Sequence, residues 1–532
     1  MSDAFVVTNG TIATMDPRNP EVEAIGVIGD RLVVSGNRRT VESALPRGFR
    51  TLDLAGQFAM PGFNEAHNHM IIYGRNLGQI NAAYPEVRSI EDIKQRVAER
   101  SNKVPGGTWI VGWGYDDNKL DERRHPNRED LDAAAPNHPV MIVNGSNHLC
   151  AVNSLALSMA GITSNTPDPQ GGHFVRDEHG EATGVLHETA QEAVRAVVPP
   201  PTVDDHVESL RRCNERYVAA GITSSQDAMS LTPEEIEAFQ LAVREEKLKL
   251  RTSLMIRENL LDHIMGLGIK QGFGNERLKV GPIKLFIDGS LIGRTAAVTQ
   301  PFFEDPDEDN MGLTMMEQAQ LDAYVMQAHR AGFQIAIHAI GDRGIEMVLD
   351  AYQKALDAYP RSNHRHRIEH CGILRPDLID RIARMNVLIV TQPIFITEYG
   401  DGFIRHLGLE RVQLTYPFRS LLDAGITVVF SSDCPVSSFE PLKSIEVSVT
   451  ERTASGKSFA LEEAITVDEA LPLYTTAGAY STFEEGIKGQ LRPGMLADLV
   501  VLEQDPRGVE PEAISGIPVS MTIIGGETVF EK

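Results

Sequence analysis

The strongest constraint on the fold is a rhythm in the middle of the chain, where short apolar segments alternate with helical segments. The apolar segments are about six residues long, the usual length of a β-strand. Strands that alternate with helices in this way are typical of parallel βαβ units. Eight such segments are present and predict an α/β fold, a (β/α)8 TIM barrel. The expected strands are residues 63–69, 222–227, 251–256, 281–288, 334–338, 366–370, 387–392 and 427–433.

Helix-start signals between these segments support the alternation. Thr232 is suited to cap a helix, Pro233 is suited to the first helical position, and Glu235 completes a capping box. Thr466 and Glu469 repeat the box near the end of the barrel region. We therefore expect helices to begin at these two places.

The two ends of the chain have a different pattern, with β-rich runs and turns but no helical periodicity. Turn signals separate the runs, among them Asn9-Gly10, Gly29-Asp30 and Gly525-Gly526. We expect a small β-sandwich domain built from both chain ends, residues 1–60 and 485–532, beside a barrel domain at 61–484.

A large insertion of about residues 70–202 separates the first barrel strand from the second. Insertions at the carboxyl ends of barrel strands form the active-site face, so this segment is placed to shape a substrate pocket. His148 is a candidate for substrate contact there. Trp109, Trp113 and Tyr115 are more typical of the insertion's own core.

Charge and cysteine content exclude several classes of partner. The 532 residues include 74 acidic and 50 basic side chains, a formal net charge of −24, which repels nucleic acid and anionic membrane surfaces. The four cysteines are far apart and indicate neither a disulfide framework nor a zinc knuckle. With no secretory leader and no membrane-length apolar stretch, a cytoplasmic location is expected. The expected partner is a small-molecule substrate, and a homodimer is left open.

A pair of histidines marks the end of the first expected strand, in PGFNEAHNH. In a strand, residues i and i+2 point to the same face, so His67 and His69 are able to bind one metal ion together. A second such pair, His364 and His366, precedes its strand instead of ending it, and we interpret it as incidental.

Further metal-binding residue types lie at the ends of other expected strands. His338, His370 and Asp433 each close one, and Lys284 lies inside GPIKLFIDGS. The carboxyl ends of parallel barrel strands meet at one rim, so these side chains are expected to meet there. A charged lysine is costly to bury, which indicates that Lys284 is paired, neutral or modified. An ion pair with Asp288 is the simpler alternative.

Taken together, these motifs resemble the amidohydrolase superfamily, in particular its YtcJ-like branch, which includes N-substituted formamide deformylases. The resemblance covers nearly the whole chain. Its matching pieces, in family order, are PGFNEAHNH, the lysine of IKLFIDGS, IHAIGDRG, HRIEHC, SSDCPV and the terminal G-x-L-x-x-G-x-x-A-D-L-V-V-L stretch.

The resemblance implies a binuclear metal site. His67, His69 and Asp433 would bind one cation, His338 and His370 the other, and Lys284, carboxylated on its amine, would bridge them. Zinc suits these ligands, and manganese, iron and nickel are alternatives. The implied reaction is hydrolysis of an amide-type C–N bond, of an N-acyl or N-formyl amine, by metal-activated water. Asp433 would transfer the proton.

Other readings of the same motifs remain open. A cyclic amide, a carbamate or an ester would suit the same residues. A mononuclear deaminase shares the first histidine pair, but it usually has H-x-x-E on the fifth strand, where this chain has Ala339, Ile340 and Gly341 after His338. A non-catalytic scaffold usually loses metal ligands, and none of the six is lost here.

Two further residues are candidates for substrate binding. Arg343 lies in Gly341–Gly344, at an expected helix start where backbone N–H groups favour an anion or a carbonyl. Asp288 shares the inward face of its strand with Lys284. A cysteine nucleophile at Cys371 or Cys434 is not required by this chemistry.

Overall fold

A computed structural model describes residues 4–145, 148–303, 305 and 309–532. Contacts divide the chain into two compact units. One contains the chain up to Met70 and again from Cys213 onward, and the other spans Ile71–Arg212.

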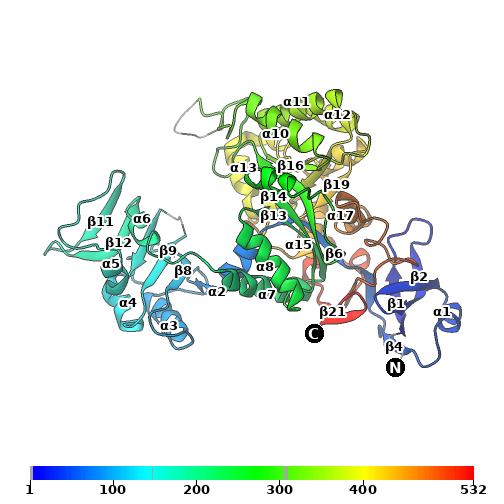
Figure 1. Ribbon diagram of the computed structural model, residues 1–532, viewed down its shortest axis with the longest axis horizontal. Helices are drawn as coiled ribbons and strands as arrows, with labels where there is room; N and C mark the ends of the chain where they lie inside the picture. Colours follow the sequence, from blue (N-terminus) through cyan, green and yellow to red (C-terminus); the bar gives the residue numbers. More distant parts are fainter. Residues whose placement is uncertain (1–3, 146–147, 304, 306–308) are drawn as a thin grey trace. The chain divides into compact units, whose positions relative to one another are not determined.

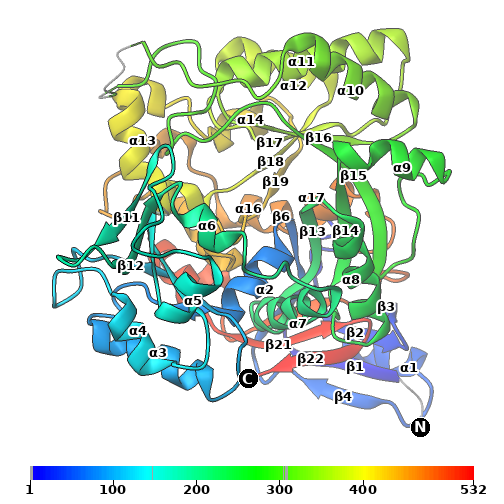
Figure 2. The same cartoon turned by 60° about the vertical axis from the view of Figure 1, so that its left-hand side comes forward.

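The first unit contains the expected barrel. Eight parallel strands are hydrogen-bonded in chain order, and each overlaps one of the eight expected segments (Figure 2). The strands are β6 (Phe63–Asn68), β13 (Ile222–Ser230), β14 (Arg251–Arg257), β15 (Leu278–Phe286), β16 (Ile335–Ala339), β17 (Arg367–His370), β18 (Leu388–Thr391) and β19 (Val428–Phe430). The α/β barrel prediction is confirmed.

Backbone hydrogen bonds close the barrel beyond the end of β19. The amide of Asp433 donates to the carbonyl of His67 at 2.8 Å, and the amide of His69 donates to the carbonyl of Cys434 at 2.7 Å. The segment after the last strand is thereby attached to the end of the first.

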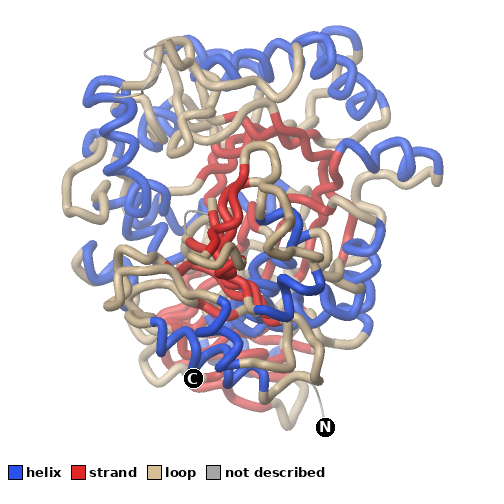
Figure 3. Tube along the Cα trace, turned by 90° about the vertical axis from the view of Figure 1, so that its left-hand side faces the viewer, coloured by secondary structure: helices blue, strands red, loops and turns tan. Residues whose placement is uncertain are grey.

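Helices cover the outside of the strand ring, and Figure 1 shows α10, α11 and α12 outside β16, while Figure 3 shows helices around the strands. Both expected capping boxes are present, at Thr232 with Glu235 and at Thr466 with Glu469. The main helices of the barrel layer are α7 (Val203–Ala219), α8 (Pro233–Arg244), α10 (Gln318–Arg330), α11 (Asp342–Ala358), α12 (Pro376–Met385), α13 (Ile394–Val412), α15 (Pro441–Thr450) and α16 (Val467–Leu473).

Strands from both chain ends form one sheet in the same unit. Its two halves join where β5 (Phe58–Pro61) pairs antiparallel with β20 (Leu499–Leu502). Figure 2 shows the C-terminal strands β21 and β22 near β1 and β2. Helix α1 (Arg38–Ala44) covers part of one face through Val41. The remaining strands are β1 (Ala4–Ala13), β2 (Glu21–Ile28), β3 (Arg31–Gly36), β4 (Arg50–Asp53), β21 (Val519–Ile524) and β22 (Glu527–Glu531).

The unit Ile71–Arg212 is built on a six-stranded sheet of its own. Tyr115 is buried in one of its apolar clusters and Trp109 packs against another, as expected for core residues. Trp113 differs, because it is 42% exposed. The unit's main elements are α3 (Ile90–Ser101), β8 (Ile110–Tyr115), α4 (Arg128–Ala134), β9 (Val140–Asn144), β10 (Leu149–Val152), α5 (Ser154–Met159), β11 (Gly172–Arg176) and β12 (Ala182–Glu188).

Among the described residues, none of the helices has both the length and the apolar character needed to cross a bilayer.

A buried ion pair joins the barrel to the end sheet. Arg251, the first residue of β14, donates from Nε to Oδ2 of Asp498 at 2.6 Å and from Nη2 to Oδ1 at 3.0 Å. Both side chains are at least nine-tenths buried, and Asp498 also accepts from the amide of Gly525.

We predict that Arg251→Ala lowers the free energy of unfolding by about 3–5 kcal/mol, because it leaves the Asp498 carboxylate buried without its counter-charge. Urea denaturation of the variant and of the wild type measures this. Arg39→Ala, an exposed arginine on α1, should change the free energy by less than about 1 kcal/mol. A loss that small for Arg251→Ala would show that this pair does not hold the two parts together.

Candidate metal centre

The six expected ligands lie together at the carboxyl-terminal rim of the barrel. Each comes from the end of a strand or the loop after it: His67 and His69 from β6, Lys284 from β15, His338 from β16, His370 from β17 and Asp433 from the segment after β19. Lys284 is fully buried, and the other five are buried or nearly so.

Distances between these side chains are those of one shared site. Asp433 Oδ1 lies 3.1 Å from His69 Nε2 and 3.4 Å from His67 Nε2. Lys284 Nζ lies 3.5 Å from His67 Nε2. The His370 ring centre is 4.8 Å from that of His67 and 4.5 Å from that of His338. Ligand atoms of His67, His370 and Asp433 all lie within 4.8 Å of one another.

The histidine rings present free nitrogens, as metal ligation requires. His67 uses Nδ1 to contact Glu369, and His370 uses Nδ1 to contact Gln392 Oε1 at 2.8 Å, so each leaves Nε2 for the site. His338 contacts the carbonyl of Gly289 through Nε2, and its buried Nδ1 has no hydrogen-bond partner among the described residues. Outer contacts that fix one ring nitrogen and free the other are typical of metal-bound histidine. These donors therefore fit a divalent cation.

Two of the ligands have a strained backbone. His370 has a φ of 70° and Asp433 a φ of 61°, in the left-handed region that residues with a side chain rarely adopt. Such strain costs on the order of 1 kcal/mol or more per residue and is concentrated at functional sites. Here the left-handed conformation sets the direction of the two side chains, His370 at the end of β17 and Asp433 in the segment after β19.

Burial lowers the pKa values of several of these ligands, which favours the uncharged forms that bind cations. It lowers the pKa of His338 to about 3, with Lys284 adding to the effect, and it holds the pKa values of His67 and His370 well below the usual range. Burial also lowers the pKa of Lys284 to about 8, although Glu369 and Asp433 act in the opposite direction. The imidazoles of His67, His338 and His370 are therefore neutral at physiological pH, and a fraction of Lys284 is a free amine.

A buried network that we did not predict from the sequence supports His67 from behind. Glu369 accepts from His67 Nδ1 and from the Arg367 guanidinium. Arg367 also donates to the side chain of Gln226 and to the carbonyl of Ala66. The HRIEH motif indicates the pair of Arg367 with Glu369, because alternation in β17 points these two side chains to the same face.

Glu65 makes a second contact that we did not predict, between the first strand of the barrel and the segment after the last strand. Its Oε1 accepts from the amides of Ser432 and His67, and burial raises its pKa to about 8. It therefore links β6 to the segment that carries Asp433.

The expected substrate-binding residues lie in three different environments. Asp288 is fully buried and accepts from the amides of Gly341, Ile340 and Ala297, with Oδ1 3.5 Å from His338 Nε2. Arg343 is exposed in the first turn of α11. His148 belongs to the unit Ile71–Arg212, where its Nδ1 lies 3.1 Å from Glu188. Substrate contact by these three remains a prediction.

Comparison with known proteins agrees with this geometry. The model of the amidohydrolase family named Amidohydro_3 matches residues 50–530. The chain is 30% identical to a Bacillus subtilis (strain 168) protein provisionally named amidohydrolase YtcJ, over 98% of both chains. It is 27% identical to N-substituted formamide deformylase of Arthrobacter pascens, over 100% of this chain and 99% of the other.

A solved structure supports the same assignment. The fold matches a crystal structure of an uncharacterized metal-dependent hydrolase from Pyrococcus horikoshii OT3 with a TM-score of 0.80 at 28% identity, covering 96% of this chain and 99% of that one. The chain belongs to the amidohydrolase family.

Proposed function

We propose that this protein is a metal-dependent amidohydrolase that cleaves the C–N bond of an N-acyl or N-formyl amine. The observation that carries the proposal is the convergence of six metal-binding side chains from five barrel strands, with histidine nitrogens free to bind. The similarity to a formamide deformylase over the whole chain supports the bond type.

His67, His69 and Asp433 would hold one divalent cation, and His338 and His370 the second. We expect both to be Zn²⁺, since imidazole and carboxylate ligands suit it. Bound cations would supply a polarised substrate carbonyl and a water whose pKa is near neutral.

Lys284 would lie between the two groups of ligands as a carbamate. Its free amine fraction, made accessible near neutral pH by the lowered pKa, would form an N–C bond to carbon dioxide and release one proton. The product would be an anion, and its two oxygens would supply ligands to the cations. The distance of 3.5 Å from Lys284 Nζ to His67 Nε2 supports this role for the lysine.

Asp433 would transfer the proton. Its carboxylate lies at the rim against His67 and His69, where it would accept a proton from the attacking water and give it to the leaving nitrogen as the C–N bond breaks. Glu369 holds His67 in the ring orientation that leaves Nε2 toward the site.

A substrate screen tests the bond assignment. The Zn²⁺-loaded protein is incubated with N-formyl, N-acetyl and longer N-acyl benzylamines, and amine release is measured. We expect the wild type to release amine from at least one of these amides. Asp433→Asn should release none, because that substitution removes the proton acceptor. Turnover of a lactone or a phosphoester, with no amine released from any amide, would contradict the proposal.

Replacing the lysine tests the proposed bridge. We predict that Lys284→Gly loses more than about 100-fold of the activity and part of its bound metal, because one shared ligand is missing. Added acetate should restore some activity, since it supplies two carboxylate oxygens. Elemental analysis and amine release measure both effects.

The exposed Lys103→Gly is the matched control and should change neither activity nor metal content. Full activity and full metal content in Lys284→Gly would rule out a bridging role for this residue.

The pH dependence of stability tests whether His338 is held neutral. The unfolded chain protonates His338 near pH 6.5 and the folded, metal-free chain only near pH 3, so between these values the unfolded state binds one more proton. Stability therefore falls as the pH decreases through this window. Relative to His338→Asn, the wild type should lose about 2 kcal/mol by about pH 5.

Urea denaturation of the chelator-treated proteins measures this difference. His179→Asn, an exposed histidine, should follow the wild-type curve. Parallel curves for the wild type and His338→Asn would mean that this imidazole titrates normally and is not held ready as a ligand.

A further inference from the structure

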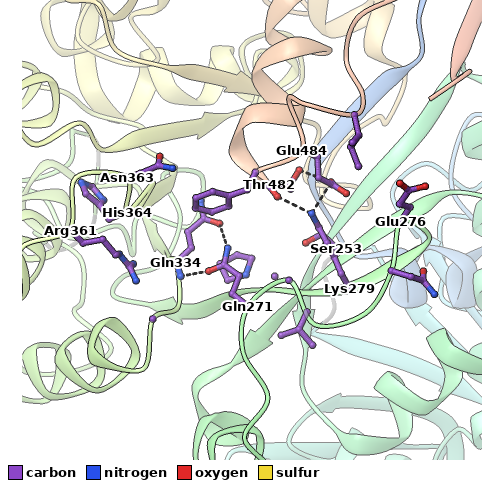
Figure 4. A pocket seen from close by; sticks show the side chains of 18 residues that line it. Ser253, Gln271, Glu276, Lys279, Gln334, Arg361, Asn363, His364, Thr482 and Glu484 are labelled. Carbon is purple, nitrogen blue, oxygen red and sulfur yellow. Dashed lines mark hydrogen bonds and ion pairs between the residues drawn. The ribbon is translucent and has the colours of Figure 1, made fainter. Parts of the chain in front are cut away.

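A pocket lies at the opposite end of the barrel from the candidate metal centre. It has a volume of about 530 Å³, within the range of small-molecule sites. Its lining includes Ser253 and Lys279 from the beginnings of β14 and β15, Gln334 just before β16, and His364 before β17 (Figure 4). Parallel strands begin at one end of a barrel and end at the other, so these residues are remote from the rim that holds the six ligands.

Most charges around this pocket are already neutralised. Glu484 lies 2.9 Å from Lys279 and 2.8 Å from Lys488, and Glu276 pairs with Arg31. Because Glu484 is shared by two lysines, these five side chains leave one excess positive charge and no unpaired carboxylate on their side of the pocket.

Arg361, on the facing side, is the exception. Its Nη2 donates to the carbonyl of Phe333 at 2.6 Å, but its Nε is buried and has no hydrogen-bond partner within the described part of the chain. No described carboxylate forms an ion pair with it. Figure 4 shows its guanidinium extending from the wall toward Gln334. A half-buried guanidinium whose Nη1 makes no hydrogen bond within the described residues is suited to bind a carboxylate.

The remaining lining suits the body of an organic molecule. Apolar surface comes from Val280, Pro282, Phe483 and Ile487, and Phe483 is 40% exposed. Phe483 also has a φ of 60°, a strained conformation for a residue with a side chain.

We propose that this pocket is a binding site for a small organic carboxylate, with the anionic group on Arg361 and the apolar body against Phe483 and Pro282. One unpaired guanidinium matches a single negative charge, and the apolar wall favours an aryl or branched alkyl acid over inorganic phosphate.

Binding of 4-fluorobenzoate to the full-length, Zn²⁺-loaded protein tests the proposal by fluorine NMR titration. Arg361→Gln should weaken binding at this site at least tenfold. Phe483→Ser should also weaken it, and the neutral 4-fluorobenzamide should bind the wild type at least tenfold less well. Arg39→Gln, which makes the same charge change on exposed α1, should leave the affinity unchanged.

The urea midpoint of each variant separates a lost site from a lost fold, since Arg361→Gln should keep the wild-type value. A carboxylate held only at the metal centre would bind Arg361→Gln as well as it binds the wild type. That result, equal binding of the amide, or no saturable binding to the wild type would overturn the proposal.

Discussion

The closure of the barrel between its first and last strands is the constraint on which the rest of the structure depends. Two backbone hydrogen bonds, from Asp433 to His67 and from His69 to Cys434, attach the segment after β19 to the end of β6. A closed barrel brings the carboxyl ends of all its strands to one rim. Residues separated by hundreds of positions therefore become neighbours, and the left-handed conformation of Asp433 points its carboxylate at the two histidines.

The rim can hold polar side chains because the buried charges of Arg367 and Glu369 next to it compensate each other. Arg367 and Glu369 are both fully buried, and a buried ion pair is tolerated only when its hydrogen bonds are satisfied. Here Glu369 is shared with His67, while Gln226 and Ala66 satisfy the guanidinium. The same contacts that make the charges tolerable also fix the ring of a proposed ligand, so stability and function use one network.

Much of this was predictable from local sequence. The alternation of apolar segments with helical segments was enough to place all eight strands, and strand-end position was enough to bring His67, His338 and Asp433 to one rim. Strand ends were less predictable: the eighth strand was expected to reach residue 433 but ends at Phe430, because the chain must leave the strand before Asp433 takes its left-handed turn. The contact of Glu369 with His67 was not predictable, since it spans 302 positions. Substrate identity depends on the loops at the rim, whose sequence carries no such periodicity.

The central claim is that six rim side chains hold a pair of cations. Anomalous diffraction from crystals grown with Zn²⁺, recorded on both sides of the zinc absorption edge, measures this directly. The account predicts two anomalous peaks, one beside His67, His69 and Asp433 and one beside His338 and His370, with density for a modified Lys284 between them. A rim without anomalous density, or zinc found only away from these side chains, would contradict it.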